Sequence, residues 1–505
     1  MLLYTHPSRV DNMNDSVSAI EHRIIDTRKK LCLSHFIISL LLLLFIDLLA
    51  LDTNGILFYV YSLWAILVYA LLVFSELRYP GLNIMVVFFV GAIMSLAFPS
   101  IQSANALIDG KSICCDEDYN VVTGFVFRTA VAMNIYYGLF ILALTHFSRG
   151  RLYVIDIHYI VNRFNLFWVS VFLYFIATVL RVIPFLELIS STLALFARNI
   201  PMLVLLLLAV YCGTQTKRDK YYRLFIILIL VEVFYNMFFG FYKADVMKPV
   251  ALYMVYYYLH CRVNNIKLLS FNTFFAAAFF MVFLLLIVYP FMEIKRSESN
   301  FTLQEDVTSF YKVDNVDILK RVLTGNYELR SDNDSDNAFS SRMSALSTNA
   351  FFYQDAYKNG YHQDLLIASV QKMVPRFLWK NKLNRSPGQM AKNYLLMKSF
   401  DSDAGSSAYV GLFAGSYFWG GWVAVIFMCF INALFISLLL RVCFSNLDNL
   451  FSWLFLFFLI FSMLRCFEEI CDGGYELCVM YTIYSLIILA SSKFFIKGVR
   501  RGNNY

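Results

Sequence analysis

Residues 31–51 read LCLSHFIISLLLLLFIDLLAL, and Asp47 is their one acidic residue. About 20 apolar residues are needed to cross the hydrocarbon core of a membrane as a helix. Similar runs recur along the whole chain of 505 residues, which is 59% hydrophobic, 18% aromatic and only 15% charged. Together with a mean hydropathy of +0.62, this composition excludes a soluble globular protein and predicts an all-α polytopic membrane protein.

The hydropathy pattern predicts about twelve transmembrane helices. These expected spans cover residues 31–51, 56–75, 82–101, 121–146, 165–183, 190–212, 221–241, 246–262, 271–292, 420–442, 451–468 and 477–496.

Positively charged residues set the expected orientation of these spans. Lys and Arg gather before the first span, after the fourth and sixth spans, and in the C-terminal tail, whereas the opposite loops are poor in them. The positive-inside rule places the Lys- and Arg-rich side in the cytoplasm. We therefore expect both termini to be cytoplasmic. No removable signal peptide is expected, because the first 30 residues contain no apolar stretch.

The chain divides into five expected parts. They are a cytoplasmic arm at 1–30, a membrane bundle with nine spans at 31–292, a large outer-face loop domain at 293–405, a second bundle portion at 406–496 and a cytoplasmic tail at 497–505. In the second bundle portion, the glycine-rich stretch 408–419 and the span after it are together too long for one crossing. We expect a short re-entrant or interfacial piece there, with its backbone covered by protein.

The loop domain is the only long hydrophilic segment, and its second half collects cations. No acidic residue occurs between Leu365 and Phe400. Arg342, Arg376 and Arg385 are candidates for binding a phosphate, because a guanidinium offers a planar fork that matches phosphate oxygens. A basic surface resting on anionic lipid headgroups is the alternative interpretation.

Four further residues are candidates for a site. His362 and Asp364 are general-base candidates by residue type, although a single histidine in a polar loop is more often simply solvated. Trp379 and Tyr361 are candidates for the membrane interface or for stacking on a sugar ring.

Arg128 lies inside the fourth expected span, where a charge costs roughly 3 kcal/mol or more. It is therefore expected to face a cavity or to pair with Glu232 or Glu187. For Asp47, near the outer end of the first span, solvation at the membrane interface is expected.

Several other kinds of site are not expected. The ten cysteines show no zinc-ligand spacing, and no P-loop, GxGxxG or Ser/His/Asp order occurs. We expect no metal, no cofactor and no nucleic-acid partner.

The run 374–382, VPRFLWKNK, is followed by Pro387-Gly388, by Ser406-Ser407 and by GLFAGSYFWGG at 411–421. This succession resembles the Wzy-type O-antigen polymerases, also called oligosaccharide repeat unit polymerases. The chain has Lys380-Asn381 where that family often has Pro-Asp.

The resemblance implies a GT-C-like fold in the bacterial inner membrane, with the loop domain in the periplasm. It implies a glycosyltransferase that polymerises oligosaccharide units carried on undecaprenyl pyrophosphate, with membrane lipids around it and a chain-length regulator and a flippase as further candidate partners. Arg376, Arg342 and Arg385, with Arg128, would hold the pyrophosphate, and His362 or Asp364 would orient or deprotonate the acceptor sugar.

A polysaccharide ligase is the closest alternative, since it differs only in the acceptor. A flippase for lipid-linked oligosaccharide is a second alternative, but flippases usually have short loops and repeat symmetry. A structural or assembly membrane protein is a third.

Overall fold

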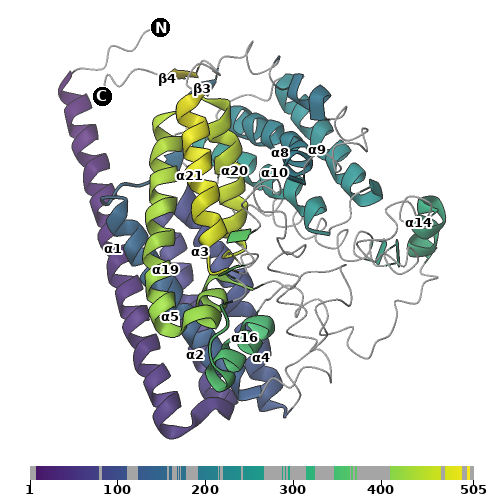
Figure 1. Ribbon diagram of the computed structural model, residues 1–505. Helices are drawn as coiled ribbons and strands as arrows, with labels where there is room; N and C mark the ends of the chain where they lie inside the picture. Colours follow the sequence, from purple (N-terminus) through teal and green to yellow (C-terminus); the bar gives the residue numbers. More distant parts are fainter. Residues whose placement is uncertain are drawn as a thin grey trace.

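The computed structural model describes residues 7–78, 82–110, 123–155, 159–161, 191–213, 220–239, 243–264, 314–324, 346–363, 410–467, 472–491 and 498–500, with shorter pieces between them. This part of the chain is mostly helical (Figure 1).

The helices follow the apolar runs of the sequence. They are α1 (Pro7–Leu49), the 3-10 turn η1 (Leu51–Thr53), α2 (Gly55–Glu76), α3 (Ile84–Ala92), the π-helical segment η2 (Ile93–Ala97), α4 (Phe98–Ile108), α5 (Thr123–Phe147), α8 (Ser191–Gly213), α9 (Lys220–Phe239), α10 (Lys243–Val263), α14 (Asn315–Thr324), α16 (Leu346–Asn359), α19 (Leu412–Ser445), α20 (Leu450–Leu464) and α21 (Tyr475–Ala490).

Among the described residues, six helices are long and apolar enough to cross a membrane. They are Ala19–Leu49, Gly55–Glu76, Ile84–Ile108, Phe125–Phe147, Lys220–Phe238 and Leu412–Ser445. Ile200–Gly213, α20 and α21 are shorter apolar helices. The prediction of a helical, multi-pass membrane protein is therefore confirmed. Of the other expected spans, 165–183 and 271–292 lie mostly outside the described residues.

Helix α5 forms the centre of the bundle. It packs against α1, α19 and α16, and nearly all of its side chains are buried. The start of α1 and strand β4 lie at one end of the bundle, and α16 and the last residues of α1 lie at the other (Figure 1).

Two short antiparallel strand pairs join loops at the end where α1 begins. Strand β1 (Leu82–Asn83) pairs with β2 (Val154–Ile155), and β3 (Tyr159–Val161) pairs with β4 (Gly498–Arg500). The sequence analysis did not predict these strands. Both pairs connect segments that the positive-inside rule places on a single side of the membrane.

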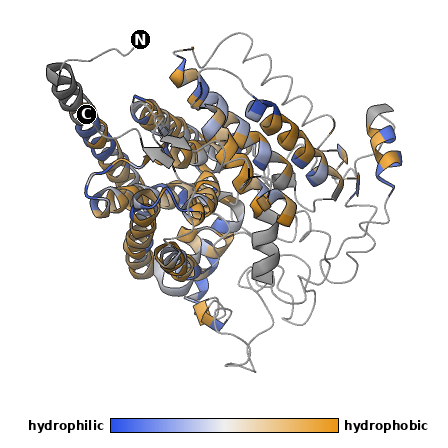
Figure 2. Ribbon diagram, turned by 90° about the horizontal axis from the view of Figure 1, so that it is seen from above, coloured by the Kyte–Doolittle hydropathy of each residue, from blue (hydrophilic) through white to orange (hydrophobic). Residues whose placement is uncertain are grey.

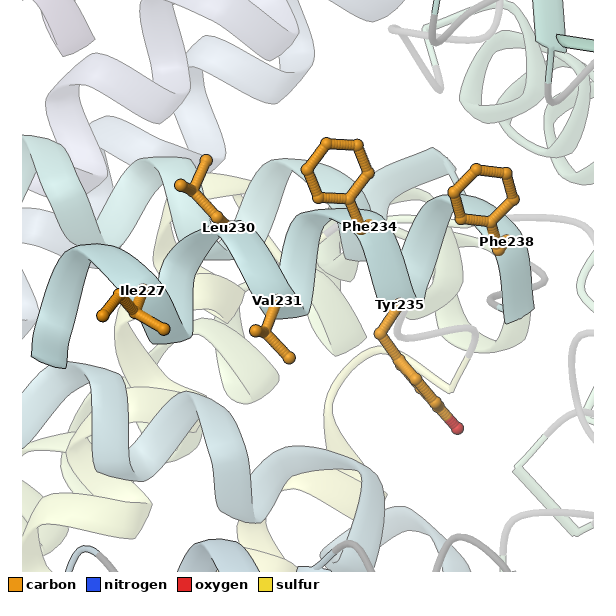
Figure 3. Close-up of a pocket in the computed structure, with 6 residues that line it drawn as sticks. All are labelled: Ile227, Leu230, Val231, Phe234, Tyr235 and Phe238. Atoms are coloured by element: carbon orange, nitrogen blue, oxygen red, sulfur yellow. The ribbon is translucent and has the colours of Figure 1, made fainter.

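Apolar side chains are also exposed along α1, α2 and α9, and hydrophobic residues make up much of the helical ribbon (Figure 2). On α9 they border an open apolar groove lined by Ile227, Leu230, Val231, Phe234, Tyr235 and Phe238 (Figure 3). Such surfaces match lipid chains, which cannot hydrogen-bond to polar groups.

A buried ion pair fastens α1 to α2 near the end of the bundle that carries the strand pairs. Arg28 Nε lies 2.5 Å from Glu76 Oε1, and Arg28 Nη2 donates to Oε2 at 2.8 Å. Asn83 Nδ2 also donates to Glu76 Oε2. The side chains of Arg28 and Glu76 are only 3% and 0% exposed, so each charge depends on the other.

A second polar contact involves α1 at His35, about two turns after Arg28. His35 Nε2 and Tyr69 Oη both lie within hydrogen-bonding distance of Asn134 Oδ1, at 3.0 and 2.8 Å. The oxygen can only accept, which places a proton on Nε2 of His35. These bonds connect α1, α2 and α5 in the middle of the bundle.

We predict that Glu76→Gln lowers the free energy of unfolding by about 3 kcal/mol or more, because it leaves the Arg28 guanidinium buried without a counter-charge. Chemical denaturation in detergent micelles would measure this change. Asp26→Asn is the matched control, because it breaks an exposed pair with Lys30 and should change stability by no more than about 0.5 kcal/mol. Equal effects of the two variants would contradict the prediction.

Candidate functional site

Three of the predicted site residues belong to the described part of the chain, and the structure brings them to one region. Arg128 lies near the start of α5, while Tyr361 and His362 follow the end of α16. This region is at the end of the bundle opposite the strand pairs (Figure 1). The other predicted residues, Asp364, Arg342, Arg376, Trp379 and Arg385, lie outside the described residues.

Arg128 is held by two carboxylates. Its Nε and Nη2 atoms donate to the two oxygens of Asp52 at 3.0 and 3.1 Å. Its Nη2 also lies 2.8 Å from Asp47 Oδ1. Asp47 is at the end of α1 and Asp52 is in η1, the turn that carries the chain over the start of α5.

The predicted pairing of Arg128 with Glu232 is wrong. Glu232 accepts a hydrogen bond from Tyr174 Oη at 2.8 Å, and Glu187, the other predicted partner, lies outside the described residues. Asp47 is half-exposed, as expected for a residue at the interface, but it also pairs with Arg128.

Aromatic rings flank the Arg128 guanidinium as well. Its central carbon lies 5.1 Å from the ring centre of Phe125 and 5.2 Å from that of Tyr357, within the range of cation–π attraction. One cation with two carboxylates gives this group a formal charge of −1. An anionic ligand would have to displace a carboxylate to reach Arg128.

Rings from α16, from the residues after it and from α19 continue the site as an aromatic wall, which we define as Tyr353, Tyr357, Tyr361, Tyr417 and Trp422. Tyr417 is the centre of this wall: its ring centre lies 4.4 Å from that of Tyr353, 6.1 Å from that of Tyr361 and 5.9 Å from that of Trp422. Burial raises the pKa of the Tyr353 phenol above its ordinary value, so this hydroxyl keeps its proton.

Helix α19 is broken at Gly420 and Gly421. Gly421 has φ 63° and ψ −156°, a combination that essentially only glycine adopts. The piece before the break, from Leu412 to Phe418, is buried. A buried piece therefore precedes the long portion of α19 at the place where the sequence predicts a re-entrant or interfacial piece.

The break provides the attachment point for His362. A helix end leaves carbonyl groups without the amide donors of a continuous helix, and the carbonyl of Phe418 accepts from the backbone N–H of His362 at 2.7 Å. The imidazole of His362 stacks on the Phe418 ring with 4.7 Å between centres. The chain reverses at Gly360, where φ is +95°, and so returns His362 over the last turn of α16.

This reversal also gives His362 a carboxylate neighbour. Its Nε2 lies 3.0 Å from Asp355 Oδ2, and Asn359 Nδ2 donates to the other Asp355 oxygen at 2.6 Å. The side chains of His362 and Asp355 are 29% and 22% exposed, so ligands can reach them. A histidine beside a carboxylate can move a proton to or from a hydroxyl group.

The sequence analysis missed Asp355 and Asp52. Asp355 lies in α16 and His362 lies beyond the end of that helix, and the turn at Gly360 brings the two side chains together. Within the described residues, no group of three or more His, Cys, Asp and Glu side chains is arranged to hold a metal ion.

Comparisons of the chain with protein-family models, characterised proteins and solved structures find no match.

We predict that the two carboxylates around Arg128 are energetically coupled. Asp47→Asn and Asp52→Asn each leave Arg128 one carboxylate, whereas the double variant leaves a guanidinium that is 8% exposed without any. The double variant should lose about 1 kcal/mol more unfolding free energy than the sum of the single variants. A double-mutant cycle measured by denaturation tests this. In an Arg128→Met background the same substitutions should be additive, and strict additivity with Arg128 present would contradict the prediction.

We predict that Gly421→Ala loosens the attachment of His362. An added Cβ would lie 2.5 Å from Tyr361 Oη, in a backbone conformation that already costs alanine about 1–3 kcal/mol. Hydrogen exchange at the His362 amide should accelerate roughly tenfold. Gly138→Ala in α5 is the control, because the nearest atom to its added Cβ is the Phe36 Cβ at 3.3 Å and its backbone φ is not positive. Unchanged protection of His362 in Gly421→Ala would refute this prediction.

Proposed function

We propose that the protein polymerises undecaprenyl-pyrophosphate-linked oligosaccharide repeat units into O-antigen or a related surface polysaccharide. It would work at the periplasmic face of the bacterial inner membrane, as a glycosyltransferase with about twelve spans and a GT-C-like fold. The observation that carries this proposal is the attachment of His362, with Asp355, to the helix break at 420–421.

The break belongs to one of the two stretches that resemble the Wzy-type polymerases, GLFAGSYFWGG at 411–421. The other stretch, at 374–382, follows His362 in the same loop. A candidate base and both resembling stretches therefore belong to the part of the chain between α16 and the long portion of α19.

The residues fit the demands of glycosyl transfer. In the proposed reaction His362, which lies beside Asp355, accepts the proton of the acceptor hydroxyl as the hydroxyl oxygen attacks the anomeric carbon of the donor sugar. The bond from that carbon to the pyrophosphate oxygen breaks, and undecaprenyl pyrophosphate leaves with the electron pair.

The leaving pyrophosphate needs fixed cations where its charge develops. We assign this role to Arg376, Arg342 and Arg385. Arg128 is not included, because Asp47 and Asp52 already hold its guanidinium. Asp364 stays an alternative base, and Trp379 a candidate for stacking on sugar or lipid.

The test is the length distribution and lipid attachment of surface glycan in a deletion strain. We expect single repeat units to reach their final acceptor while the ladder of longer chains disappears. Long chains that stay on undecaprenyl pyrophosphate would instead identify a ligase, and units retained in the cytoplasm would identify a flippase. An unchanged glycan would refute an enzymatic role in its synthesis.

Complementation with variants tests the assigned residues. His362→Ala should lower polymerisation at least about a hundredfold, and Arg376→Ala should abolish it, each at unchanged protein level. Arg376→Lys separates charge from fork geometry. His146→Ala is the matched control, since His146 is exposed near the end of α5 that lies away from the site. Normal chain lengths with His362→Ala would remove His362 from the mechanism.

A further inference from the structure

The aromatic wall has a buried part and an exposed part. Tyr353 and Tyr417 are 2% and 4% exposed, whereas Tyr357 and Tyr361 are 56% and 58% exposed. The buried rings contact both exposed ones: Tyr353 lies 6.5 Å from Tyr357, and Tyr417 lies 6.1 Å from Tyr361, measured between ring centres. The rings of Tyr357 and Tyr361 thus pack against buried tyrosines on one side and are exposed on the other.

Carboxylates border this exposed aromatic surface. Tyr357 lies over the Arg128 guanidinium, and Arg128 binds Asp47, whose side chain is 48% exposed. Next to Tyr361 in the chain, His362 lies beside Asp355. Exposed carboxylates are costly in hydrocarbon, so this surface faces water or headgroups rather than lipid chains.

The charge of the surface disfavours an anion. The Arg128 guanidinium lies over the Tyr357 ring, and with Asp47 and Asp52 it forms a group of formal charge −1. The exposed Lys358 follows Tyr357 in α16, and Asp355 in the same helix offsets its charge, so the formal charge of the surface stays at −1. A pyrophosphate placed here would meet two carboxylates and no unpaired guanidinium among the described residues. The negative formal charge of this group repels a further anion.

A sugar ring fits the same features. Flat aromatic faces bury the apolar C–H face of a pyranose, while tyrosine hydroxyls and carboxylate oxygens bind its hydroxyl groups. A binding site that combines aromatic area with a few oriented polar groups is typical for small polar ligands.

We infer that Tyr357, Tyr361 and Asp47 bind an uncharged sugar residue of the glycan, and that the pyrophosphate binds elsewhere. This inference deepens the proposed function and rests on it, because it separates the sugar from the leaving group of the same reaction. The sugar lies next to His362, which would place an acceptor hydroxyl within reach of the candidate base.

The experiment uses the full chain in lipid nanodiscs and two probes. One probe is the lipid-free oligosaccharide released from the repeat units of the strain, and the other is inorganic pyrophosphate. Saturation-transfer NMR measures binding of the oligosaccharide, with and without pyrophosphate. We expect Tyr357→Leu and Tyr361→Leu each to weaken oligosaccharide binding at least tenfold, and millimolar pyrophosphate to leave it unchanged.

Three further variants make the result specific. Tyr357→Phe keeps the ring and should bind within about twofold to threefold of wild type, since a single neutral hydrogen bond contributes little. Asp47→Asn tests the carboxylate if a leucine variant fails to fold. Tyr475→Leu, at the start of α21 and outside the aromatic wall, is the control and should bind normally.

Wild-type binding by both leucine variants, or displacement of the oligosaccharide by pyrophosphate, would overturn this assignment. Neither result touches the proposed polymerase, whose own test is the glycan ladder of the deletion strain. Conversely, an intact ladder with tyrosine-dependent oligosaccharide binding would refute the polymerase and leave a glycan-binding surface.

Discussion

The packing of α1 against α2 and α5 depends on a requirement that holds wherever water is excluded: a buried charged or hydrogen-bonding group must find its partner within the protein. Helix α1 meets this requirement at three levels. Arg28 pairs with Glu76, His35 with Asn134, and Asp47 with Arg128. These contacts are distributed over about 28 Å of helix.

The spacing of these contacts fixes how α1 can lie. Apolar packing alone tolerates sliding and rotation of one helix against another, because many offsets bury similar area. Three polar contacts along the length of α1 remove that freedom, since any shift would leave a buried group without its partner. The contact between Asp47 and Arg128 belongs to the candidate site. The position of Asp47 in that site therefore follows from the packing of the whole of α1.

The helix break in α19 solves a different problem, which is how to attach a polar loop to a membrane bundle. A continuous helix offers no free backbone groups along its length. The break at Gly420 and Gly421 exposes the carbonyl of Phe418, and His362 binds it. The site is thereby tied to the bundle by backbone geometry, which side-chain substitutions elsewhere in the loop do not alter.

Much of the bundle could be predicted from the sequence, because apolar length decides which segments can span. The expected spans at 56–75, 121–146 and 221–241 agree with α2, α5 and α9 within a few residues. The need of Arg128 for a partner was also predictable, since membrane burial of a charge is costly. Its partners were not, because Asp52 reaches it only through a three-residue 3-10 turn.

Contacts within the loop domain at 293–405 were harder to predict, because they too depend on local turns of the backbone. His362 was recognisable as a candidate by residue type, but its neighbour Asp355 was not. That contact depends on one glycine with positive φ, and apolar periodicity carries no signal for such a turn.

The two ends of the cation-rich loop give the last constraint on the site. The loop leaves the described part after His362, which binds Phe418, and returns at Gly411, whose N–H donates to Asn349 Oδ1 at 2.9 Å. Both ends are thus anchored where α16 meets α19. A closed loop keeps its residues near its anchors at a modest entropic cost. The cations between 372 and 398 belong to the segment that joins these two anchors. In the proposed reaction they bind the anionic leaving group, while the carboxylate-bordered surface binds the neutral sugar, so the two ends of the substrate have separate sites.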